Sequence, residues 1–65
     1  MTRDELPPFL TTRQVAEFLN CSLEFLKTAR KRGTGPQFTK ISPDAVRYAR
    51  ESLLAWIDAN TMRAA

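Results

Sequence analysis

Basic side chains gather in the middle of this 65-residue chain, which carries a net charge of +3. Between Ser22 and Arg50 only Glu24 and Asp44 are acidic, whereas acidic residues outnumber basic ones in the remainder. Ammonium and guanidinium groups bind phosphate, and an uneven charge of this kind is typical of proteins that bind polyanions. Basic segments also occur on proteins that bind nothing, so charge alone does not decide the function.

The sequence contains few of the residue types that enzymes use for catalysis. It contains no histidine, one cysteine and one tyrosine. A single thiol can neither hold zinc nor form an internal disulfide, and no nucleophile–base pair or pair of carboxylates is recognisable. We therefore expect a binding protein without catalytic residues, metal or cofactor, and without a small-molecule substrate.

The predicted location is the cytoplasm, in association with the bacterial nucleoid. No apolar run approaches the roughly 20 residues that span a membrane. The N-terminal residues 1–5 have no apolar signal region behind them. The unpaired Cys21 fits a reducing compartment.

A short basic helix is predicted between Ser22 and Gly33. The Ser22 hydroxyl suits an N-cap, and Gly33 can adopt the left-handed conformation that ends a helix. Glu24, Lys27 and Lys31 fall on one face. The opposite, apolar face holds Phe25, Leu26 and Ala29. Such a helix suits insertion into a DNA groove, and the plainer alternative is a solvated surface helix.

A second helix is predicted just before it. Thr11 and Gln14 have the spacing of a capping box, and the apolar periodicity continues to about Leu19. Residues 20–22 then form a three-residue link, the length expected in a helix-turn-helix. In that motif the second helix enters the major groove by its N-terminal part. The basic helix therefore stands in the recognition position.

A small hairpin is predicted after the basic helix. Residues 38–41 and 46–48 alternate as half-buried strands do, and residues 42–45 have turn chemistry. Its inner face would hold Phe38 with Val46 or Tyr48. Its outer residues would be Lys40 and Arg47, so the hairpin resembles a wing that touches phosphates or the minor groove.

The predicted fold class is mainly α with a small β-hairpin, a winged helix-turn-helix that ends in a helix over residues 50–60. Residues 1–8 are predicted to be a flexible arm, residues 9–60 the DNA-binding domain and residues 61–65 a frayed tail. Phe9 and Leu10 would staple the first helix, and Cys21 would be a buried turn residue. The aromatic and aliphatic residues predicted to lie in the core are Phe18, Phe25, Tyr48, Leu53, Trp56 and Ile57.

The ordered pattern resembles the excisionase and AlpA-like group of small winged-helix proteins in the MerR-like superfamily. The resemblance rests on residues 10–22, with their Leu-Thr-Thr opening and Val-Ala pair, and on residues 46–57, with their Ala-Trp-Ile close. It covers about residues 9–59. Two departures are Leu23 and Glu24, where relatives often carry basic residues, and Ala29, where they often carry an aromatic. Because of these departures, the resemblance does not indicate which base sequence the protein reads.

The resemblance implies sequence-specific binding of double-stranded DNA by a recombination directionality factor, which steers an integrase of the tyrosine or serine recombinase type toward excision of a mobile element. The predicted contacts from the recognition helix are Ser22, Leu23, Glu24, Lys27, Thr28, Arg30 and Lys31. Those from the wing are Lys40 and Arg47, and those from the start of the first helix are Thr12, Arg13 and Gln14. Because so small a module binds weakly alone, we expect head-to-tail self-association on DNA and bending of the DNA.

Two other functions fit the same residues. A transcription regulator of a phage or integrative element would have the same fold and differ in where its sites lie. A basic adaptor that binds an acidic protein partner would show no DNA shift at moderate salt.

Overall fold

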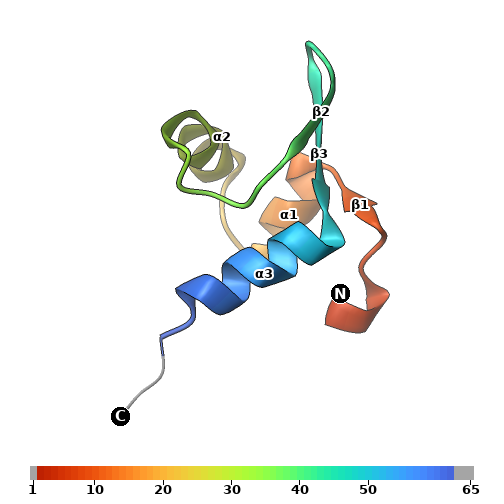
Figure 1. The fold of residues 1–65 in the computed structure, drawn as a ribbon, viewed down its shortest axis with the longest axis vertical. Coiled ribbons are helices and arrows are strands. Elements are labelled where there is room, and N and C mark those ends of the chain that lie inside the picture. The colour runs from red at the N-terminus through yellow and green to blue at the C-terminus, as the bar shows by residue number, and fades with distance from the viewer. Residues whose placement is uncertain (1, 63–65) are drawn as a thin grey trace.

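Three helices and a small antiparallel sheet make up the computed structural model, which describes residues 2–62 (Figure 1). A short 3-10 helix η1 (Arg3–Glu5) and strand β1 (Phe9–Leu10) come first. Helices α1 (Thr12–Leu19) and α2 (Leu23–Arg32) follow, then strands β2 (Thr39–Ser42) and β3 (Ala45–Ala49) and helix α3 (Arg50–Asn60). The winged helix-turn-helix fold is confirmed. No helix within residues 2–62 is both long and apolar enough to cross a membrane.

Local hydrogen bonds fix the helix ends where the sequence predicts them. The amide of Gln14 donates to Thr11 Oγ1 at 3.1 Å, and the Gln14 side chain accepts from the Thr11 amide at 2.9 Å, which completes the capping box. The amide of Phe25 donates to Ser22 Oγ at 3.0 Å. Asn20 and Gly33 end their helices with φ values of 57° and 70°, the left-handed conformation of a helix C-cap.

The sheet has a third strand that the sequence analysis did not predict. Its order is β1-β3-β2, with Leu10 opposite Tyr48 and Thr39 opposite Arg47. Residues 9 and 10 therefore pair with β3, and Leu10 shares the buried cluster with Val15 of α1, as the expected hydrophobic staple requires. The pairing leaves Leu10 fully buried and Phe9 55% exposed, because neighbouring side chains of a strand point to opposite faces.

The core lies between this sheet and the helices. Its buried members are Leu6, Leu10, Val15, Ala16, Leu26, Tyr48 and Leu53, with Phe18, Leu19, Cys21, Leu23, Leu54 and Ile57 partly buried around them. The core placement of Tyr48 and Leu53 is confirmed. Trp56 is half-buried and its Nε1 donates to the Thr34 carbonyl at 3.0 Å, which ties α3 to the loop after α2.

Phe25 is 51% exposed, so its placement in the core was wrong. The buried stripe of α2 is narrow and holds Leu26 and Ala29. A Cβ on Gly35 would stand 3.0 Å from the Ala29 Cβ, so the following loop presses closely on that stripe. Phe25 precedes Leu26 by one residue and is therefore turned about 100° away from it around the helix.

The N-terminal segment is packed, where the sequence analysis predicted a flexible arm. Leu6 is only 3% exposed, and its carbonyl accepts from Arg50 Nη1 at 2.9 Å. The Arg50 amide donates to the Pro8 carbonyl, and Arg3 Nη2 forms an ion pair with Asp58 at 3.1 Å. One apolar side chain and these cross-links to α3 hold the segment. Of the predicted frayed tail, residues 63–65 lie outside the described part, and Met62 is 96% exposed.

Candidate nucleic-acid interface

One groove is bordered by the start of α1, one face of α2 and the β2–β3 hairpin. It has a volume of about 330 Å³, and we call it the basic groove. Its lining residues are Thr11, Thr12, Arg13, Leu23, Lys27, Arg30, Asp44, Ala45, Val46 and Arg47. The turn through Asn20 places α1 and α2 side by side, and β3 holds the hairpin beside them through its pairing with β1. Three separate segments of the sequence thereby meet at one surface.

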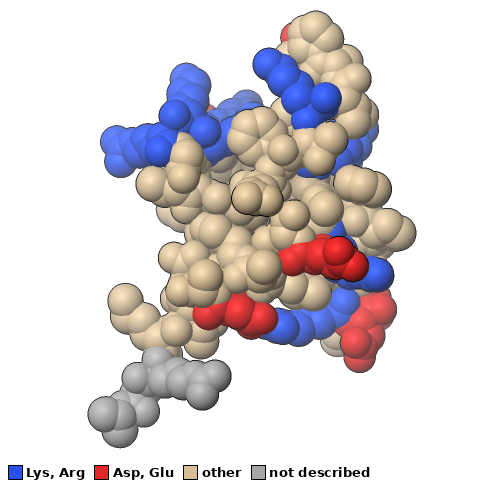
Figure 2. Space-filling model, in the orientation of Figure 1, with Lys and Arg blue, Asp and Glu red and all other residues tan. Residues whose placement is uncertain are grey.

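The basic groove carries four cationic side chains and one carboxylate. Arg13 comes from α1, Lys27 and Arg30 from α2, and Arg47 from β3, whereas Asp44 comes from the hairpin turn. Figure 2 shows Lys and Arg gathered over α2 and the hairpin, and most of the visible Asp and Glu toward the opposite end, near α3 and the N-terminal segment. The groove therefore lies at the more basic end of the molecule, whereas both signs of charge are present at the other end (Figure 2).

Arg30 connects the three walls of the groove. Its Nη1 donates to the Tyr48 hydroxyl at 3.0 Å and to Thr12 Oγ1 at 3.4 Å. Its guanidinium carbon also lies 5.6 Å from the centroid of the Phe38 ring, within the range of a cation–π contact. Arg30 is half-buried, so these contacts fix its side chain within the protein and leave its remaining N–H groups for other partners.

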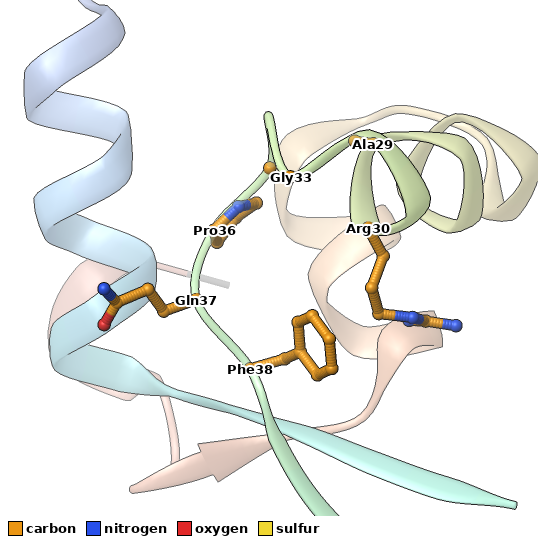
Figure 3. Close-up of a pocket in the computed structure, with 7 residues that line it drawn as sticks. Ala29, Arg30, Gly33, Pro36, Gln37 and Phe38 are labelled. Atoms are coloured by element: carbon orange, nitrogen blue, oxygen red, sulfur yellow. The ribbon is translucent and has the colours of Figure 1, made fainter.

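A second hollow of about 320 Å³ lies behind Arg30, between the end of α2 and the loop that leads to β2. Figure 3 shows Arg30 and Phe38 pointing toward one another across it, while Gln37 points away toward α3. Phe38 also lies against Tyr48, with ring centroids 6.3 Å apart. The hollow thus adjoins the contacts that join α2 to the hairpin.

The two predicted wing cations lie on opposite faces of the hairpin, which corrects the prediction that both are outer residues. Lys40 stands opposite Val46, and Arg47 stands opposite Thr39. Since Val46 and Tyr48 are two residues apart, Lys40 shares the inner face, although it is exposed. Arg47 belongs to the outer face, and its Nη1 donates to the Val46 carbonyl at 2.9 Å.

About half of the predicted site residues line the basic groove. Thr12, Arg13, Leu23, Lys27, Arg30 and Arg47 line it. The predicted residues outside its lining are Ser22, Glu24, Thr28, Lys31, Lys40 and Gln14. Among these, Ser22 and Gln14 make capping hydrogen bonds, and the other four are exposed.

Sequence reasoning missed Thr11 and residues 44–46 as parts of the groove. Thr11 had been assigned only to helix capping. The hairpin turn has no basic residue to draw attention, and its place beside α2 depends on the pairing of β3 with β1. The available signal was the acidic Asp44, which stands inside a basic stretch.

The chain matches a known protein family. The family model described as a helix-turn-helix domain matches residues 9–61 of the chain. No curated protein compared with the chain is similar enough to count as a match. The matched range includes every residue that lines the basic groove.

Proposed function

The chain belongs to the helix-turn-helix domain family and is a small sequence-specific DNA-binding protein, and from this premise we propose that it acts as an excisionase. In this role it binds adjacent sites beside the attachment site of a mobile element, bends the DNA and steers an integrase toward excision. One observation supports the DNA-binding part of this proposal: Lys27 from α2 and Arg47 from β3 line the same basic groove.

On DNA, the N-terminal half of α2 enters the major groove, as recognition helices do. Lys27 is exposed and lies on the groove side of α2, so it reaches base edges or the adjacent phosphates. Glu24 and Thr28 are exposed as well, and Glu24 can accept from a cytosine amino group. Arg13 at the start of α1 contacts a phosphate on the flank of the DNA major groove.

In this proposal Arg30 is mainly a structural residue, whereas its position in the recognition helix predicts a contact with DNA. Its hydrogen bonds to Tyr48 and Thr12 hold it within the protein. Its main role is to keep α2, α1 and the hairpin at a fixed spacing, which DNA must match. Lys31 is exposed and remains a phosphate contact from the far side of α2.

Self-association on DNA is head-to-tail in this proposal. Most of the visible acidic side chains lie away from the basic groove (Figure 2), which supports such an arrangement, because these carboxylates can attract the basic end of the next copy. Contacts to an integrase add to this assembly. A closed dimer that forms without DNA would contradict it, and sedimentation velocity of the free protein distinguishes the two.

The decisive experiment is a titration onto DNA that spans the attachment site, with bending measured on circularly permuted fragments at two salt concentrations. Stepwise, cooperative and salt-sensitive complexes with a bend are expected. A single unbent complex at a promoter would favour an AlpA-like transcription regulator. No complex with that DNA or with duplexes selected from a random pool would contradict DNA binding and leave an adaptor for an acidic protein.

A further inference from the structure

The wing contains a β-bulge that sets one apolar residue apart. Lys40 pairs with Val46 and Ser42 pairs with Ala45, so the register shifts between Lys40 and Ser42. Ile41 is therefore the additional residue that has no partner across the hairpin. A bulge changes the direction of a side chain and bends its strand, and such irregularities are common at functional sites.

Ile41 is 59% exposed, although its side chain is one of the most apolar in the chain. All four residues of β2 are exposed, and Figure 1 shows the hairpin extending away from the helices. The described chain therefore leaves more than half of the Ile41 surface uncovered. A single exposed isoleucine is common and needs no explanation, so its neighbours decide whether it has a role.

Those neighbours are suited to the backbone of a nucleic acid. Lys40 precedes Ile41 on the inner face of the hairpin, and Arg47 lies on the outer face of the adjoining strand. An apolar side chain thus projects from a narrow ribbon that has a cation on each face. Two cations placed in this way can meet the two phosphate backbones that border a minor groove, with the apolar residue between them.

We propose that Ile41 is a wedge that enters the minor groove and partly unstacks one base-pair step, so that the DNA kinks at the wing. The inference deepens the proposed function, on which it rests, by assigning the bend to one side chain. Isoleucine is among the residues that act as such wedges, and unstacking a step kinks the duplex by about 20–90°. Lys40 and Arg47 hold the wing in the groove while Ile41 enters.

The test uses the full chain and a duplex selected from a random pool for tight binding. Ile41→Thr keeps the branched β-carbon that favours a strand but replaces the outer carbons with a hydroxyl. Ile41→Leu keeps an apolar wedge of the same size. Met62→Thr is the matched control, since Met62 is an exposed apolar residue beyond α3. Circular dichroism checks that each variant has the wild-type melting temperature.

Two readouts report on the wedge. Permuted fragments give the bend angle, and 2-aminopurine placed at successive steps gives increased fluorescence where a base unstacks. The wild type, Ile41→Leu and Met62→Thr should bend the DNA and increase the fluorescence at one step. Ile41→Thr should bind with a smaller bend, without the fluorescence increase and with an unchanged salt slope, because it removes no charge.

A wild-type complex that is bent but shows no unstacked step, or an Ile41→Thr complex with the full bend, would overturn the wedge and leave DNA binding intact. A wild-type protein that binds no duplex would overturn both the wedge and the proposed function. The two failures are therefore distinguishable.

Discussion

The Arg30 guanidinium on α2 donates to the Tyr48 hydroxyl on β3 at 3.0 Å. Tyr48 is the largest fully buried side chain, and its strand continues directly into the wing. A residue of the recognition helix is therefore attached to the strand that carries the second DNA-binding element. The hydrogen bond to this buried tyrosine therefore fixes the distance between α2 and the wing.

Tyr48→Phe removes this hydrogen bond and leaves the ring in place. We expect the free energy of unfolding to fall by about 1.5–3 kcal/mol, the usual net value of a hydrogen bond to a charged group. DNA affinity should fall as well, since the wing is then less firmly placed. Urea unfolding and a DNA titration measure the two effects. Thr12→Val, which removes the longer 3.4 Å bond, is the control for stability and should lower the free energy of unfolding by less.

Lys27→Ala and Arg47→Ala should each reduce the slope of log affinity against log salt by about one unit, because each removes one phosphate contact. The double variant should lose about two units. Arg3→Ala is the control, since Arg3 pairs with Asp58 far from the groove, and its slope should equal that of the wild type. A slope that stays unchanged in Lys27→Ala would remove α2 from the phosphate-binding surface.

Asp44→Asn should strengthen DNA binding, most of all at low salt. The Asp44 carboxylate is the one acidic group in the lining of the basic groove, and it repels a nearby phosphate. The gain should shrink as salt rises, because salt screens exposed charges. Glu17→Gln on the exposed side of α1 is the matched control. Weaker binding by Asp44→Asn would instead indicate that the carboxylate accepts a hydrogen bond from a base.

Leu6→Ala should destabilise the protein by about 2–5 kcal/mol, the usual cost of truncating a buried leucine. Leu6 is 3% exposed and packs in the main cluster. Thermal and urea unfolding test this directly. Met62→Ala, at an exposed apolar position, should leave the midpoint unchanged. Equal midpoints for Leu6→Ala and the wild type would show that residues 2–8 are a loose arm after all.

Burial raises the pKa of the Cys21 thiol. A raised pKa means less thiolate at a given pH, and the thiolate is the reactive form. Native protein should therefore react with a thiol reagent more slowly than free cysteine at pH 8, and the rate should keep rising to higher pH. In denaturant the rate should return to that of free cysteine. Native and denatured protein reacting at the same rate would contradict this.

Local chemistry was predictable from the sequence, and long-range pairing was not. The caps at Thr11 and Ser22 and the left-handed ends at Asn20 and Gly33 depend on residues within a few positions of each other. The two residues of β1 gave no such signal, because their partners on β3 lie almost the whole domain away. A two-residue strand is too short to show alternation.

The places of Phe25 and Arg30 in the fold could not be predicted from the sequence, for one shared reason. Phe25 has a helical spacing that fits the core, but the tertiary packing of α2 covers too narrow a stripe to include it. Arg30 is basic like its neighbours, and only the folded position of Tyr48 shows that its guanidinium is held within the protein. In each case the residue type was compatible with two roles, and a distant segment decided between them.

The position of β1 also sets an order of events during folding. Strand β3 stands between β1 and β2, so the sheet is incomplete until residues near both ends of the domain meet. The contacts between α1 and α2 join neighbouring segments, whereas the sheet must close a long loop, so we expect the helix pair to form before the sheet. A nascent chain that ends before Tyr48 therefore lacks both the largest buried side chain of the core and the strand that joins the wing to β1.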